Sequence, residues 1–138
     1  MYTSGTANAD MCSLCADYDA INACTQSIIG RDFSTLCAVE IGFGSKPYRI
    51  SYFNSRGVAV YGIDLDKPVM NGTPAEFFDI AQTNGWLRAS KSCVRHLLFE
   101  RSARRAFLAQ IHAETPSFVF DKKRLVVGNA VLPETWNR

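Results

Sequence analysis

Six basic side chains fall within eighteen residues in the second half of this chain, and phosphate binding is the chemistry that they could perform. Glu100 is the one acidic residue within that span. Guanidinium and ammonium groups neutralise phosphates and release the counterions around them, so this basic region predicts contact with nucleic acid. Its members are Arg88, Lys91, Arg95, Arg101, Arg104 and Arg105.

Charge is distributed unevenly along the whole chain, with the excess of basic residues in the second part. Residues 1–85 carry nine acidic and five basic residues, a balance of −4, whereas residues 86–138 carry ten basic and four acidic residues, a balance of +6. The sum is the modest +2 of the 138-residue chain. An asymmetry of this kind bears on the partners of a protein and not on its fold.

The elements predicted around the basic region follow each other in the order of a helix–turn–helix unit. A helix ends at Gly85, a second helix would carry Arg88, Lys91 and Arg95 into a major groove, and residues 121–124 would form a wing over phosphate. The stretch from Gly85 to the first inward residue of the second helix is longer than a tight turn allows. The alternative is that the bases form a solvated helix face.

Four side chains could supply a tetrahedral zinc site. Cys12 and Cys15 form a C-x2-C pair, and Cys93 and His96 form a C-x2-H pair. Both pairs fall in predicted helices, and Cys15 belongs to an apolar stripe in which a free cysteine acts as a small hydrophobe. We therefore assign no metal ligand, and the sequence leaves open whether the four side chains converge.

A thiol nucleophile is a third possibility. Cys93, His96 and Glu100 stand in a row along one helix face and have the chemical types of a nucleophile, its base and an orienting group. Side chains in a row on one helix rarely converge, so we assign no catalytic residue.

Two other motifs are interpreted as structural. Gly42-Phe43-Gly44 precedes a predicted strand, so we expect no helix N-terminus there that could bind phosphate. Asp64 and Asp66 end a predicted strand and are interpreted as solvated carboxylates. Because the common catalytic and nucleotide-binding motifs are absent, we predict no cofactor and expect a binding or regulatory module rather than an enzyme.

The elements that position these residues begin with a helix over about 11–29, which Gly30 ends. Apolar residues then alternate over 36–43, 48–53 and 58–63, separated by short turns. Short turns between consecutive strands require antiparallel pairing, so these segments predict a meander.

Helices occupy the centre of the second half. Thr73-Pro74-Ala75-Glu76 predicts a helix start with a capping box, and Asn84-Gly85 predicts its end. A longer helical stretch covers roughly 91–113; it is either sandwiched between layers or broken near 100–102. Residues 118–120 and 124–127 then predict a final hairpin.

We therefore predict one α+β domain over residues 1–138, with residues 1–10 flexible. Its expected order is an N-terminal helix, a three-stranded antiparallel meander, two helices and a C-terminal β-hairpin, with the helices packed on the sheet. The hydrophobic fraction of 47% is enough for such a core. Five cysteines without a secretory signal suit a cytoplasmic protein with reduced thiols, and no apolar run approaches membrane length, so no membrane partner is expected.

The leading function is thus a small binding or regulatory module that contacts nucleic acid through the basic region. The alternative is a homo-oligomer that binds a small ligand or a partner protein in an aromatic pocket beside the meander. Tyr48, Tyr52 and Tyr61 lie on the predicted strands and would supply the aromatic surface.

Overall fold

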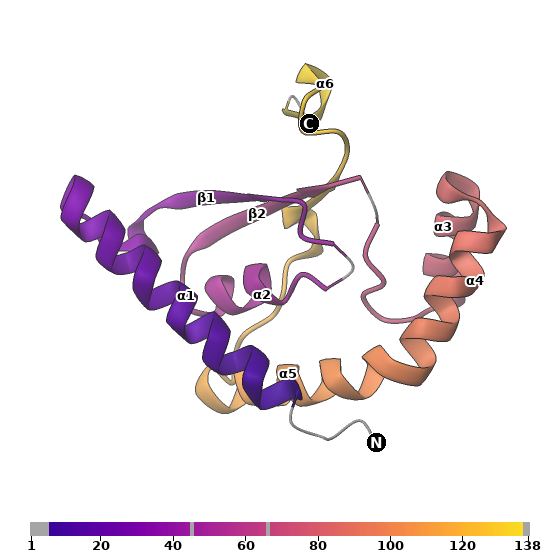
Figure 1. Cartoon of the computed structure of the whole chain (residues 1–138), viewed down its shortest axis with the longest axis horizontal. Coiled ribbons are helices and arrows are strands. Elements are labelled where there is room, and N and C mark those ends of the chain that lie inside the picture. The colour runs from indigo at the N-terminus through magenta and orange to yellow at the C-terminus, as the bar shows by residue number, and fades with distance from the viewer. Residues whose placement is uncertain (1–5, 45, 66, 137–138) are drawn as a thin grey trace.

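A computed structural model describes residues 6–44, 46–65 and 67–136 and shows a parallel sheet supported by helices on one face (Figure 1). The first half of the chain alternates helix and strand. Its elements are α1 (Thr6–Ile29), the short 3-10 turn η1 (Phe33–Thr35), β1 (Cys37–Ile41), α2 (Tyr48–Ser55) and β2 (Ala59–Asp64). Residues 1–5 of the segment expected to be flexible lie outside the described residues.

The second half is mostly helical and returns to the sheet near its end. Its elements are α3 (Pro74–Asn84), α4 (Trp86–Arg95), the π-helical turn η2 (His96–Glu100), α5 (Arg101–Glu114), the 3-10 turn η3 (Lys122–Arg124), β3 (Leu125–Val127) and α6 (Pro133–Trp136). The chain is therefore a small domain of mixed helix and strand, as predicted. No helix within the described ranges combines the length and apolar character needed to cross a membrane.

The predicted strand pairing is wrong. Among the described residues the strands form one sheet in the order β1-β2-β3, and both pairings are parallel. Cys37 pairs with Ala59, and Gly62 pairs with Leu125. Parallel neighbours need a long crossover, which α2 supplies between β1 and β2, and α3 to α5 supply between β2 and β3. The described strands form neither the antiparallel meander nor the C-terminal hairpin.

The error originates in residues 48–53, which form helix α2 instead of a strand. Tyr48, Ile50 and Tyr52 alternate as in a strand, but Ile50 and Phe53 also have the three-residue spacing of a helix face. Burial decides between the two patterns, because Ile50, Tyr52 and Phe53 are all buried when the segment is helical. The hydroxyl of Ser51 also donates to the carbonyl of Pro47 at 2.8 Å and closes the first turn.

The main core lies between one face of the sheet and three helices. Leu14 of α1, Ile50 of α2 and Ile111 of α5 meet Val60 of β2 there. Tyr48 stacks on Phe107 of α5 with ring centroids 4.4 Å apart. Figure 1 shows α1, α2 and α5 on this same side of the strands. The position of the carboxyl ends of β1 and β2 is therefore fixed by this helical layer.

The opposite face of the sheet is open and apolar. Val39 is 46% exposed, Ile41 64% and Tyr61 41%. In the described part of the chain no helix covers β1 from this side (Figure 1). Parallel sheets are usually covered on both faces, so this surface is unusual for its type.

Helices α3 and α4 form a hairpin, here called the arm, that stands beside the sheet (Figure 1). The arm has a small core of its own, made by Val69, Ile80, Ala81 and Ala89. The predicted capping box is confirmed: Thr73 Oγ1 accepts from the backbone N–H of Glu76, whose carboxylate accepts from that of Thr73. Gly85 ends α3 as predicted.

The long helical stretch predicted over 91–113 is interrupted by the π-turn η2. A π-turn inserts one residue into the helix and rotates the rest of the helix about its axis. Residues on the two sides of η2 therefore belong to different surfaces: Val94 of α4 is exposed, whereas Phe107 and Ile111 of α5 are buried in the main core.

Candidate functional site

The loop between β1 and α2 lies at the carboxyl edge of the sheet. Gly42 and Gly44 adopt φ values of +78° and +67°, which favour glycine. A Cβ built on either residue would meet nothing within 4 Å, so the space above this backbone is open. The prediction that a strand comes after the loop is wrong, and a helix begins at Tyr48 instead.

Asp64, the last residue of β2, is joined to this loop. The backbone N–H of Gly44 donates a hydrogen bond of 2.7 Å to Asp64 Oδ2, and the N–H of Gly128 donates to the Asp64 carbonyl at 2.9 Å. The carboxyl edges of β1, β2 and β3 thus converge on one acidic residue. An ionised carboxylate has about four acceptor positions, so it can accept from several donors at once. Asp66, named beside Asp64 in the sequence, lies outside the described residues.

A close approach between α2 and β2 holds this edge together. A Cβ at Gly62 would clash with Ile50 of α2 and would lie 2.6 Å from the ring of Phe43. Glycine at this position therefore lets the helix and the loop lie directly against the strand. Close packing of helix on strand is one of the tasks that glycine performs in nucleotide-binding βαβ units.

Charged side chains border the loop on the side of α1. A hollow of about 340 Å³ is lined there by Asp17, Glu40, Lys46 and Arg49, among others, and Arg49 pairs with Asp17 at 2.8 Å. Burial raises the pKa of Glu40, Arg49 opposes that shift, and Asp17 adds to it. This side of the loop is therefore occupied by an internal charge network.

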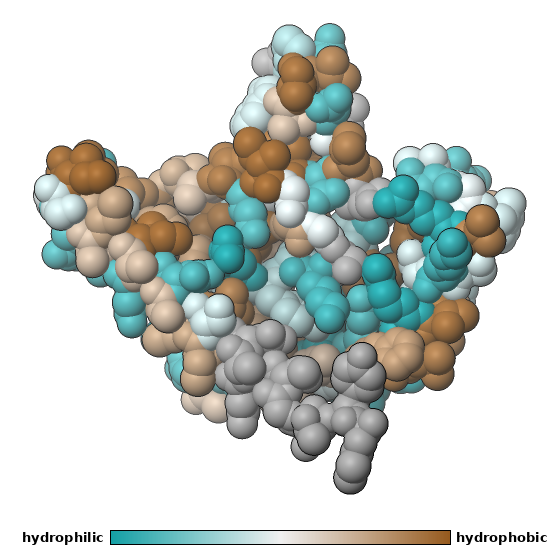
Figure 2. Space-filling model, in the orientation of Figure 1, coloured by the Kyte–Doolittle hydropathy of each residue, from teal (hydrophilic) through white to brown (hydrophobic). Residues whose placement is uncertain are grey.

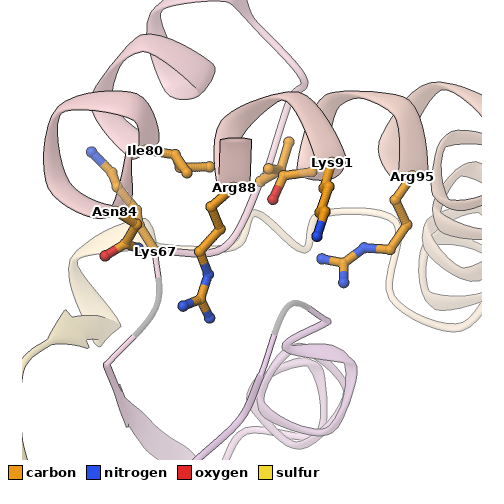
Figure 3. A pocket seen from close by; sticks show the side chains of 8 residues that line it. Lys67, Ile80, Asn84, Arg88, Lys91 and Arg95 are labelled. Atoms are coloured by element: carbon orange, nitrogen blue, oxygen red, sulfur yellow. The ribbon is translucent and has the colours of Figure 1, made fainter. Parts of the chain in front are cut away.

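Three of the six predicted bases are brought together by the structure. Arg88, Lys91 and Arg95 extend from one face of α4 and line a pocket of about 330 Å³, which we call the basic pocket (Figure 3). Lys67, which sequence analysis did not select, lies in the same pocket. Val69 and Ile80 give it an apolar wall, and Asn84 and Ser92 add an amide and a hydroxyl.

The basic pocket is only partly neutralised by neighbouring carboxylates. Lys67 Nζ lies 2.6 Å from Asp79, and Arg95 Nε lies 2.9 Å from the buried carboxylate of Glu100. Among the described residues, Lys91 has no ion-pair partner. Figure 2 shows hydrophilic residues gathered where the arm faces the sheet. At Lys91 the pocket therefore keeps a positive charge that no described carboxylate neutralises.

The other three predicted bases do not belong to this pocket. Arg104 is half-buried, and its guanidinium donates to the carbonyl of Val69 at 3.2 Å. Burial lowers the pKa of Arg104, and Tyr48, Glu76 and Glu100 oppose that shift. Arg101 and Arg105 are exposed on α5 and do not line the pocket. Of the six bases in the predicted basic region, three thus share the pocket, and Lys67 joins them there.

The cysteine hypotheses receive no support from the structure. Within the described residues, no three or more His, Cys, Asp or Glu side chains gather as a metal site would require, so the Cys12, Cys15, Cys93 and His96 set is not assembled. His96 is buried beside Phe77, and Glu100 pairs with Arg95. Cys93 instead lines an apolar groove with Trp86 and Phe78.

The three tyrosines expected to lie on adjacent strands and supply aromatic surface are dispersed. Tyr52 is buried in the main core, Tyr48 stacks on Phe107, and Tyr61 lies on the open face of the sheet below the guanidinium of Arg124. The pocket beside a meander is therefore absent from the described structure, because the strands that would form it are a helix and a parallel pair.

Sequence reasoning missed Gly42, Gly44 and Asp64 as a joint site. The signal is present in the sequence: a glycine pair after one apolar segment and an acidic residue at the end of the next, twenty positions after Gly44. Comparison of the chain with protein-family models, with curated proteins and with solved structures finds no match.

Proposed function

We propose that this chain binds a ribonucleoside-containing ligand at the carboxyl edge of its parallel sheet. The observation that carries the proposal is the contact between Gly44 and Asp64, which places an open glycine loop and a strand-end carboxylate side by side. Open α/β sheets bind their ligands outside the carboxyl ends of the strands. In nucleotide-binding units an acidic residue about 20 positions after the glycines accepts hydrogen bonds from the ribose hydroxyls.

Each part of the edge has a task in this proposal. The backbone at Gly42 and Gly44 carries no side chain, so a ligand can approach the loop closely. The carboxylate of Asp64 would accept from the two ribose hydroxyls while it keeps its bond to the Gly44 N–H. Hydrogen bonds that involve a charged group contribute about 1.5–3 kcal/mol each, enough to orient the sugar.

The loop favours a nucleoside that carries no diphosphate. In the dinucleotide-binding pattern G-x-G-x-x-G, the third glycine would stand at Pro47. Proline has no N–H to donate to a pyrophosphate, and its ring occupies space at the start of α2. S-adenosylmethionine is a nucleoside ligand without phosphate, and a methyl-transfer enzyme is the activity that this ligand would imply. The proposal departs from the sequence prediction that the chain uses no cofactor.

Isothermal titration of the purified chain with S-adenosylmethionine, adenosine and NAD tests this function. We expect S-adenosylmethionine to bind more tightly than NAD, and Asp64→Asn to weaken its binding at least tenfold. The asparagine side chain of this variant can still accept from the Gly44 N–H, so the loop stays anchored. Asp19→Asn, on the exposed face of α1, is the matched control and should bind as the unmodified chain does. Absence of nucleoside binding, or equal binding by the Asp64→Asn variant, contradicts the proposal.

Nucleic-acid contact through α4 is a second candidate, supported by the convergence of Arg88, Lys91 and Arg95 on one face. A protein that contacts phosphates through these three bases should bind duplex DNA with an affinity that falls steeply as salt rises. Fluorescence anisotropy with labelled duplex and single-stranded DNA between 50 and about 200 mM salt measures that slope. No binding at the lowest salt removes this candidate and leaves the nucleoside site unaffected.

A further inference from the structure

The basic pocket lies beside the proposed nucleoside site, and chain connectivity limits the distance between them. Lys67 is three residues after Asp64, so their Cα atoms are at most about 11 Å apart. Figure 3 shows the side chains of Arg88, Lys91 and Arg95 leaving α4 on the side of the loop between β1 and α2. The basic pocket and the proposed nucleoside site are therefore close neighbours.

We infer that the basic pocket binds a phosphate group, and that this group belongs to a second ligand held next to the nucleoside. Only the position of this second ligand next to a nucleoside rests on the proposed function; phosphate binding by the pocket does not. Two guanidinium groups and two ammonium groups around one pocket are the donor set that phosphate recognition uses. Asn84 and Ser92 add neutral polar groups at its wall.

The size and the charge of the pocket both suit this occupant. A volume of about 330 Å³ lies at the small end of ligand-binding pockets and fits a phosphate with part of the molecule that carries it. Asp79 pairs with Lys67, and Glu100 pairs with Arg95. The pairing of Arg95 with a buried carboxylate holds its guanidinium in place, whereas Lys91 has no partner among the described residues and is available to a phosphate.

The phosphate could belong to a small phosphomonoester or to the 5′ end of a nucleic-acid strand. Both present the same dianionic group to the pocket, and they differ in the molecule to which that group is attached. A terminal phosphate carries about −1.5 to −2 charges near neutral pH, more than the single charge of an internal phosphodiester. The pocket is therefore expected to prefer a terminal phosphate over the phosphodiester backbone.

Lys91→Ala is the variant that tests the pocket. Lys91 is exposed, so its removal leaves no buried charge unpaired. Arg95 is unsuitable, because the loss of its side chain would strand the buried carboxylate of Glu100. Lys123→Ala is the matched control, since Lys123 is an exposed lysine on η3 outside the pocket.

Calorimetric titrations at one ionic strength should use phenyl phosphate, a 5′-phosphorylated oligonucleotide and the same oligonucleotide with a 5′ hydroxyl. We expect Lys91→Ala to weaken binding of phenyl phosphate about fivefold or more, and Lys123→Ala to leave it unchanged. If only the phosphorylated oligonucleotide binds tightly, the phosphate source is a nucleic-acid end; if phenyl phosphate binds as tightly, it is a small molecule. No phosphate binding, or equal losses in both lysine variants, overturns the inference.

The two proposals fail in different ways. Lys91→Ala should leave S-adenosylmethionine binding intact, and Asp64→Asn should leave phenyl phosphate binding intact. If the chain binds phenyl phosphate in the pocket but no nucleoside, the phosphate site stands and the nucleoside proposal is wrong. If it binds S-adenosylmethionine and Lys91→Ala changes nothing, the nucleoside site stands and the phosphate pocket is wrong.

Discussion

The imidazole of His96 lies against the backbone of Gly72, so closely that a Cβ on Gly72 would come within 2.6 Å of His96 Cδ2. This contact joins the segment before α3 to the π-turn η2. His96 is buried, and its ring also packs edge-on toward Phe77 of α3, with centroids 6.1 Å apart. The orientation of the arm, and with it the basic pocket, therefore depends on a residue without a side chain at position 72.

We expect Gly72→Ala to destabilise the arm through this contact. Gly72 has φ +68°, and Gly30 has a similar value of +65° with nothing within 4 Å of a Cβ. Gly30→Ala therefore measures the cost of the backbone conformation alone, about 1–2 kcal/mol. Urea unfolding should show a larger loss for Gly72→Ala, by about 1–3 kcal/mol, because His96 must also move. Equal losses in the two variants would show that the imidazole contact contributes nothing.

A second prediction concerns acid stability and Glu76. Burial alone would raise the pKa of Glu76, but hydrogen bonds from the N–H groups of Asn71, Gly72 and Thr73, together with Lys122, hold the pKa of this carboxyl below its ordinary value. A lowered folded-state pKa means that the ionised carboxylate stabilises the fold at neutral pH. That contribution is complete above about pH 4.3, the ordinary value, and is lost as the pH falls through the lower folded-state pKa.

Glu76→Gln should therefore be less stable than the unmodified chain at pH 7, by about 1 kcal/mol, and the difference should shrink toward zero as the pH falls below about 4. Denaturant unfolding at several pH values measures it. Glu114→Gln, at an exposed carboxylate 3.5 Å from Arg56, serves as the control and should show a smaller effect. A stability difference for Glu76→Gln that is independent of pH would contradict this account.

The open face of the sheet leads to a third prediction. Val39, Ile41 and Tyr61 expose apolar surface on a parallel sheet. Exposure of such an apolar patch to water is unfavourable in free energy, so we expect the chain to self-associate through this patch. Sedimentation velocity should show a concentration-dependent shift that Ile41→Lys reduces. Ile28→Lys, at a position on α1 that is also exposed, should leave the shift unchanged; a monomer at all concentrations would contradict the prediction.

Local signals were predicted correctly from the sequence, and distant pairings were not. The capping box at Thr73 and Glu76 depends on residues three positions apart, so the sequence contains all the information it needs. The strands at Cys37–Ile41 and Ala59–Asp64 were also predicted, because their apolar runs are short and bounded by turn residues. Their parallel pairing depends on whether the segment between them is a strand or a helix. The apolar residues of that segment fit both the alternation of a strand and the spacing of a helix.

That single ambiguity also concealed the candidate site. Once residues 48–53 are taken as a strand, Gly42 belongs to the preceding strand, Gly44 begins a hairpin turn, and Asp64 is only an acid at a strand end. When the segment is a helix, the same residues belong to one βαβ unit, and the glycine loop meets the carboxylate. The basic region was recognised by composition, but composition does not say which way a side chain points. The π-turn at His96–Glu100 separates Arg88, Lys91 and Arg95 from the bases of α5.

Arg104 provides a last test of this division of the basic region. Its guanidinium donates to the Val69 carbonyl and contacts Met70 Sδ at 3.6 Å, so it ties α5 to the segment that leads into the arm. Arg104→Ala should lower the free energy of unfolding by about 1–3 kcal/mol, since it leaves a half-buried carbonyl without its donor. It should not change the salt slope of polyanion binding, whereas Lys91→Ala should reduce that slope by about 1. Unfolding in urea and heparin binding at several salt concentrations measure the two effects. If Arg104→Ala reduces the salt slope and leaves the stability unchanged, Arg104 contacts the anion and has no structural role.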